Sequence, residues 1–285
     1  PTAVEHDPSN VQAAALTRAP DGGDLVATGN DAGTLQLMRR APDGTWTRLC
    51  RLQLSPRPVM DLAFAPDGRA LAAASEDGRA ALVAISAGAC GEPRYLDAGA
   101  TTLYSVAFAP DGKTLVTASL DARAQVWGTD GRLLANLVGH KDRIYSAEFS
   151  PDGRWLLTAS RDGAVRVWEH PGSAGARVQS EVPRAEGPGT ADATPAQGSY
   201  LVLDGKLGGV AYARFSPDGH SIAAAYWENA AVLWRLWTED PTAVPAQEAI
   251  WGRDRARLTL IREAYRFRDN IGVRTPRASR QTEPQ

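Results

Sequence analysis

The stretch that decides the fold is IYSAEFSPDGRWLLTASRDGAVRVW, residues 144–168. Tyr145, Ala147 and Phe149 alternate with polar neighbours, and this period of two is typical of a half-buried strand. The triplet PDG at 151–153 has turn chemistry, because proline presets φ, Asp can bond its own backbone and glycine tolerates a positive φ. The pattern predicts three short strands joined by two tight turns, a meander too small to be stable alone.

Copies of this unit occur along the chain. PDG begins at Pro20, Pro66, Pro110, Pro151 and Pro217, at steps of 46, 44, 41 and 66 residues, and an apolar residue follows each proline by seventeen positions. A repeat of about 40–45 residues with four strands is the sequence signature of a propeller blade. Fourth strands are expected at 45–54, 94–96, 132–138 and 200–203. The sequence therefore predicts an all-β propeller of four-stranded blades, five of them clear.

The chain divides into a propeller and two flanking segments. We expect residues 1–10 to form an N-terminal tail or edge strand and residues 11–252 to form the propeller. Within it, residues 170–199 are rich in Pro, Gly, Ala, Ser and Thr and predict a disordered insertion. The Arg-rich segment 253–285 predicts a helix or a degenerate sixth blade, followed by a disordered tail. Either the ring closes at five or six blades, or it is truncated and belongs to a longer protein.

Composition excludes several classes of protein. Hydrophobic content of 43% and charged content of 22% are ordinary for a soluble domain, and a net charge of −2 gives no global bias toward nucleic acid. No apolar run approaches the ~18 residues of a membrane span. Cys50 and Cys90 have no CxxC spacing, so we interpret them as separate thiols and predict a cytoplasmic location.

The repeat resembles the WD40 family. The best match is Gly139-His140, followed by TASRDGAVRVW at 158–168. The resemblance implies a hydrogen-bonded structural tetrad of His140, Ser160, Asp162 and Trp168, which would satisfy buried polar groups inside the blade. Other blades depart from it; blade three has Gly99 where His140 stands. FAPDG and FSPDG turns and an Ala/Arg/Gly-rich composition favour bacterial-type repeats.

We find no catalytic arrangement and predict no enzyme, metal or cofactor. The four histidines are scattered, and neither HExxH nor GxSxG occurs. Acids recur once per blade, at Asp31, Asp77, Asp121, Asp162 and Glu228, and we interpret them as turn and tetrad residues. A propeller enzyme with a channel metal is one alternative function. Nucleic-acid binding through the basic segment 253–285 is another.

The resemblance also implies a binding face. WD40 propellers dock partner peptides around their central channel, and the family's positions fall here on Met60, Tyr104, Arg143, Tyr145, Arg161 and Trp227. Aromatic, arginine and methionine side chains are enriched in protein interfaces. We therefore expect a non-catalytic scaffold for a protein or peptide partner, alone or as the sensor or interaction module of a larger signalling protein.

Overall fold

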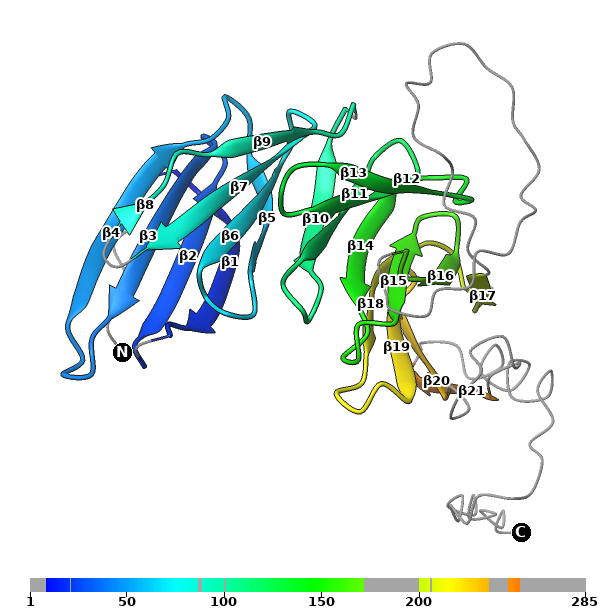
Figure 1. The fold of residues 1–285 in the computed structure, drawn as a ribbon. Coiled ribbons are helices and arrows are strands. Elements are labelled where there is room, and N and C mark those ends of the chain that lie inside the picture. The colour runs from blue at the N-terminus through cyan, green and yellow to red at the C-terminus, as the bar shows by residue number, and fades with distance from the viewer. Residues whose placement is uncertain are drawn as a thin grey trace, which may run out of the picture.

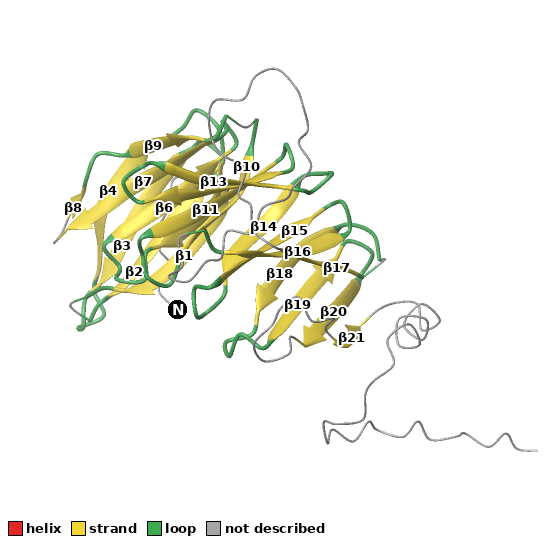
Figure 2. Ribbon diagram, turned by 45° about the vertical axis from the view of Figure 1, so that its right-hand side comes forward, coloured by secondary structure: helices red, strands yellow, loops and turns green. Residues whose placement is uncertain are grey.

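The chain folds into strands and turns. The computed structural model describes residues 9–20, 22–86, 89–99, 101–171, 200–205, 207–235 and 246–251. These residues contain no helix, and hence no helix that could cross a membrane. Their strands form five antiparallel sheets, which we call blades one to five (Figures 1 and 2).

Each blade is a meander whose strands follow one another in sequence order. Blade one contains β1 (Val11–Arg18), β2 (Asp24–Asn30), β3 (Thr34–Arg40) and β4 (Trp46–Gln53). Blade two contains β5 (Val59–Phe64), β6 (Ala70–Ser75), β7 (Arg79–Ser86), β8 (Ala89–Cys90) and β9 (Arg94–Asp97). Blade three contains β10 (Leu103–Phe108), β11 (Thr114–Ser119), β12 (Arg123–Gly128) and β13 (Leu133–Val138). Blade four contains β14 (Ile144–Phe149), β15 (Trp155–Ser160), β16 (Ala164–Glu169) and β17 (Tyr200–Asp204). Blade five contains β18 (Val210–Phe215), β19 (Ser221–Tyr226), β20 (Ala230–Arg235) and β21 (Ala246–Trp251).

The architecture confirms the predicted all-β blades, and β4, β9, β13 and β17 lie where fourth strands were expected. In blade two the outer edge is divided, because β8 and β9 both pair with β7. Predictions for residues 1–8, 172–199 and 252–285 lie outside the described residues. His170, the first residue of the predicted insertion, is buried; it contacts Thr114 Oγ1 of blade three through Nε2 at 3.0 Å.

The PDG turns have the chemistry that the sequence indicates. Asp67 Oδ1 accepts a hydrogen bond from the Arg69 N–H at 2.9 Å, and Gly68 has a φ of 67°. An L side chain rarely adopts that backbone conformation, so glycine is favoured there. Asp152 makes the same bond to the Arg154 N–H at 3.0 Å. The turn joining the first two strands of a blade is therefore encoded locally.

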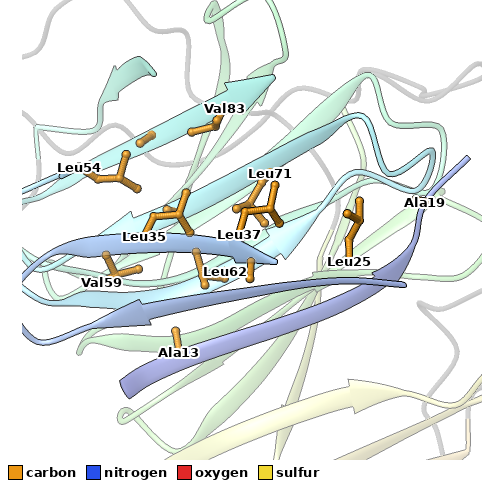
Figure 3. Close-up of a cluster of buried hydrophobic side chains, with 13 residues drawn as sticks. Ala13, Ala19, Leu25, Leu35, Leu37, Leu54, Val59, Leu62, Leu71 and Val83 are labelled. Carbon is orange, nitrogen blue, oxygen red and sulfur yellow. The ribbon is translucent and has the colours of Figure 1, made fainter. Parts of the chain in front are cut away.

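Apolar cores lie between neighbouring blades. The core between blades one and two contains Leu35 and Leu37 on one side and Leu62 and Leu71 on the other (Figure 3). Comparable buried clusters join blades two to three, three to four and four to five. The innermost strands β1, β5, β10, β14 and β18 contact one another in that order. The five blades form an open arc, with blades one and five at its ends (Figure 1).

The two cysteines form a disulfide, so the interpretation of separate thiols was wrong. Cys50 on β4 and Cys90 on β8 have Cα atoms 5.9 Å apart, within the range that a disulfide requires. Forty residues separate them in sequence. They meet because β4 and β8 lie at the outer edges of adjacent blades. The bond links blade one covalently to blade two.

Candidate partner-binding face

A β-bulge recurs in the innermost strand of every blade. Ile144 pairs with Ser160 and Ser146 pairs with Ala159, so Tyr145 is an extra residue in β14. The equivalent extra residues in the other blades are Gln12, Met60, Tyr104 and Ala211. A bulge redirects one side chain out of the regular alternation. Three of the six predicted face residues, Met60, Tyr104 and Tyr145, occupy this position.

Three aromatic side chains form a continuous row across blades three, four and five. The ring centroids of Tyr104 and Tyr145 lie 5.2 Å apart, with an interplanar angle of 57°. Tyr145 and Trp227 lie 5.6 Å apart in an edge-to-face arrangement at 62°. These geometries are favourable for aromatic pairs. Trp227 is nevertheless 61% exposed, so the row ends in a large ring that is held in place and open to solvent.

A glycine allows Trp227 of blade five to lie close to blade four. The Trp227 N–H donates to the Gly209 carbonyl at 2.9 Å. A Cβ at position 209 would lie 3.2 Å from Trp227 Cδ1 and 3.2 Å from the Arg161 backbone. Such contacts are tighter than side chains normally make. Gly209 therefore lets Arg161 and Trp227 lie on either side of one backbone segment.

Two arginines lie beside the row and share one carboxylate. Arg143 Nε is 3.7 Å from Asp142 Oδ1, and Arg161 Nε is 3.9 Å from Asp142 Oδ2. The Arg161 N–H also donates to the Arg143 carbonyl at 2.9 Å. The Arg161 side chain is 54% exposed. Ion pairs this open contribute little to stability. Arg143 is the less exposed of the two, and its Nε atom is buried.

The structure thus connects five of the six predicted residues and leaves Met60 apart from them. Aromatic contacts, Asp142 and Gly209 link Tyr104, Tyr145 and Trp227 to the two arginines. Met60 is half-buried at the bulge of blade two, one blade beyond Tyr104. Sequence reasoning did not name Asp142, although it directly precedes Arg143.

Hydrogen bonds next to the bulges tie one blade to the next. Asp61, the residue after Met60, accepts the Val106 N–H through Oδ2 at 3.0 Å. Ser105 accepts the Ala147 N–H at 3.4 Å, and Ser146 accepts the Ala213 N–H at 3.3 Å. Burial raises the pKa of Asp61, against the hydrogen bonds that lower it. These three junction bonds join blades two to five.

A second polar cluster lies inside blade four. Trp168 Nε1–H donates to Thr158 Oγ1 at 2.8 Å, and the Thr158 hydroxyl donates to His140 Nε2 at 2.8 Å. His140 Nδ1–H donates to Asp162 Oδ2 at 2.9 Å. These directions follow because indole can only donate and an ionised carboxylate can only accept. The His140 side chain is fully buried, so the chain of bonds satisfies its nitrogens.

The charges of this cluster are fixed by its surroundings. Burial raises the pKa of the Asp162 carboxyl, but hydrogen bonds from His140, the Lys141 N–H and Arg166 outweigh it and hold that pKa far below its usual range. Burial lowers the pKa of His140, and the neighbouring Arg166 lowers it further, against the bond to Asp162. Asp162 is therefore ionised and His140 neutral near pH 7, which matches a structural network.

The network differs from the expected tetrad at one hydroxyl. Thr158 joins His140 to Trp168, whereas Ser160 Oγ donates to the Asp142 carbonyl at 2.8 Å and accepts the Asp162 N–H at 3.1 Å. Ser160 thus closes the turn next to the candidate face. The cluster also includes Arg166, whose NH1 donates to Asp162 Oδ2 at 2.9 Å. Sequence reasoning named neither Thr158 nor Arg166.

The alternative of a metal site can be tested against the part of the chain that the structure describes. Among the described residues, no group of three or more His, Cys, Asp or Glu side chains is arranged to hold an ion.

Two family models match the sequence. A model described as WD domain, G-beta repeat matches residues 94–128 and 131–169. A model described as the anaphase-promoting complex subunit 4 WD40 domain matches residues 21–101. Together they cover more than half of the chain. No curated protein matches it. The repeat models and the four-stranded blades agree, and the chain belongs to the WD40-repeat family.

Proposed function

We propose that this chain is a non-catalytic module that binds a protein or peptide segment across the row Tyr104–Tyr145–Trp227. The observation that carries the proposal is Trp227, which is 61% exposed while its ring packs on Tyr145. An aromatic ring already held in position loses little conformational entropy on binding and offers a large contact area. WD40 repeats generally mediate interactions between proteins, which supports the same role.

The chemistry of the face favours a particular kind of ligand. Apolar or aromatic ligand side chains would pack on the row, while Arg143 and Arg161 would donate to carbonyl or carboxylate oxygens. Two arginines share the carboxylate of Asp142, so one of their two positive charges is not balanced within this trio. An extended segment with an aromatic or aliphatic anchor next to an acidic residue fits best. The role as sensor or interaction module of a larger signalling protein, and the bacterial origin of the repeats, belong to this proposal.

The test is selection from a random peptide library on the intact chain, followed by affinity measurement for the selected peptides. The double variant Tyr145→Ala, Trp227→Ala should lose binding at least about tenfold while keeping its melting temperature. Leu134→Ala, which truncates an exposed side chain on β13, is the matched control and should bind as the unaltered chain does. Unchanged binding in the double variant would show that another surface is used. Loss of binding together with a lower melting temperature would show that these rings belong to the core.

The cytoplasmic location is a separate proposal, and the Cys50–Cys90 disulfide opposes it because such bonds persist in oxidising compartments. The test is to isolate the protein from its natural source, alkylate its free thiols in denaturant without a reductant, and count the alkylated cysteines by mass spectrometry. Two alkylated thiols support the cytoplasm. If neither cysteine is alkylated, the result supports an oxidising compartment.

A further inference from the structure

Blade five exposes a sheet face that is buried in other blades. The register of β18, β19 and β20 places Tyr212, Ala225 and Ala231 in one cross-strand row and Arg214, Ala223 and Leu233 in the next. The opposite face, with Ala213 and Trp234, packs on blade four. Tyr212 is 44% exposed, and Ala223 and Ala225 are exposed as well. We call this surface the blade-five end face.

Blade two shows what this face does when it has a neighbour. Its matching rows are Asp61–Ala74–Ala80 and Ala63–Ala72–Leu82. Alanine and leucine thus recur at four of the six matching positions. In blade two, Ala72, Ala74 and Ala80 have no exposed surface, because they pack on Leu103, Val106 and Leu115 of blade three. The small side chains of the blade-five end face suit the close approach of another sheet.

Blade one has the complementary face, which is exposed along β1, where Ala14 and Leu16 lie, and buried at Gln36. Its register gives the rows Ala14–Thr28–Gln36 and Leu16–Val26–Met38 on the side opposite the core shared with blade two. Leu16 is 71% exposed. In blade two, the matching row Phe64–Leu71–Val83 packs on blade one, and Leu71 and Val83 are buried. We call this surface the blade-one end face.

One polar atom on the blade-one end face also lacks a partner. The Thr28 hydroxyl is buried and has no hydrogen-bond partner among the described residues. A buried hydroxyl without a partner costs free energy, which a polar group brought by another sheet would recover.

We propose that a second copy of this chain covers these surfaces, with the blade-one end face of one copy packed on the blade-five end face of the next. Every junction inside the chain has a row of large apolar residues in front of the following blade. Between blades two and three that row, Phe108–Leu115–Trp127, meets an alanine-rich face. One chain thus carries both halves of a junction at its two ends. The contact joins different surfaces, so it is head-to-tail and leaves one face free on each terminal copy. It is separate from the aromatic row and does not depend on the proposed function.

The test is light scattering of the purified chain over a series of concentrations. The unaltered chain should gain mass beyond the monomer as concentration rises. Leu16→Glu and Ala225→Glu each place a charge in the contact, and each alone should weaken association at least about tenfold. Val138→Glu, at an exposed position on β13, is the matched control and should associate normally. Melting temperatures confirm that all three variants are folded.

Mixing the two variants makes the test specific for a head-to-tail contact. In an equimolar mixture, the intact blade-five end face of Leu16→Glu meets the intact blade-one end face of Ala225→Glu. The mixture should therefore form dimers and nothing larger. A monomer at every concentration of the unaltered chain would overturn the proposal. So would association that survives both variants, or a mixture that stays monomeric.

Discussion

Blades three and four have the same strand pattern but differ in how their polar interiors are completed. In blade three, Trp127 Nε1–H donates to Thr117 Oγ1 at 3.0 Å, which matches the bond from Trp168 to Thr158. Blade three has Gly99 where blade four has His140, and the chain of hydrogen bonds stops at the threonine. Asp121 pairs instead with Arg123 Nε at 2.8 Å, where the arginine side chain is 45% exposed.

This difference separates two roles within one motif. The threonine satisfies the buried indole in both blades, so that bond does not need the histidine. The histidine connects the indole and threonine to the turn carboxylate. Asp162 therefore belongs to a buried network, whereas Asp121 of blade three belongs to a more exposed ion pair. Blade four should therefore depend on its turn aspartate much more than blade three does.

Replacing the turn aspartates tests this dependence with the largest expected effect. Asp162→Ala removes the acceptor of His140 and the carboxylate that pairs with NH1 of buried Arg166. It should lower the free energy of unfolding by about 3–5 kcal/mol. Asp121→Ala removes an open ion pair and should cost about 1 kcal/mol or less. Chemical denaturation of both variants measures the difference, and equal losses would contradict the comparison.

The two threonines give the next test. Thr158→Val removes the acceptor of the Trp168 N–H and the donor to His140 Nε2, so we expect a loss of about 2–3 kcal/mol. Thr117→Val leaves only the Trp127 N–H unpaired and should cost about half as much. Denaturation midpoints would show this ratio. Ser160→Ala is a useful third variant because it leaves the indole bond intact.

Blade four also contains a carboxyl group that blade three lacks. Burial raises the pKa of Glu148 from 4.5 to about 7, against the Phe215 N–H and Arg214, which lower it. The folded state therefore keeps this proton up to a higher pH than the unfolded chain. Stability falls as pH rises from about 4.5 through 7, and the full penalty applies above about 7. The equivalent residue in blade three is Ala107.

Glu148→Gln should remove that penalty. We expect it to stabilise the protein by about 1–2 kcal/mol at pH 8 and to have little effect at pH 4, since the carboxyl is then protonated in both states. Thermal unfolding across this pH range measures the effect. A variant that is destabilised at pH 8 but unchanged at pH 4 would show instead that the carboxylate is a favourable partner of Arg214.

The smallest effect concerns the turn after the second strand. Blade four has Gly163 with a φ of 91°, whereas blade three has Ala122 with a φ of 64°. An L residue in this region is strained by about 1 kcal/mol, so Ala122→Gly should stabilise blade three by up to that amount. Gly163→Ala should destabilise blade four, since its Cβ would lie 3.1 Å from the Gly208 carbonyl oxygen. Calorimetry of the two reciprocal variants checks the signs.

Local chemistry made most of the fold predictable. PDG turns fix the hairpins, and period-two patterns fix the strands, so the blades could be identified without long-range information. The Thr158 role also has a sequence signal that was missed: Thr117 and Thr158 each precede their tryptophan by ten residues. The Cys50–Cys90 bond has no such signal, because it depends on which outer strands of different blades lie side by side. The exposure of the two end faces depends in the same way on the arrangement of whole blades.

The residue types of the aromatic row were predictable, but its geometry was not. Offsets within the repeat selected Tyr104, Tyr145 and Trp227, yet their ring contacts depend on bulges and on Gly209. The bulge itself is not visible in the alternation of the sequence, since one extra residue only shifts the pattern. Asp142 was missed because its role arises from the proximity of two arginines on different segments.

The hydrogen bonds at the junctions give the arc a mechanical property. Ser105 and Ser146 each follow a row tyrosine directly and hold the next blade by its backbone. The angle between blades and the spacing of the row are therefore set by the same short segments. A ligand lying across the row spans two junctions and acts as a splint that opposes bending of the arc. Stiffness of the arc and affinity for the ligand should then vary together, even where a substitution never touches the ligand.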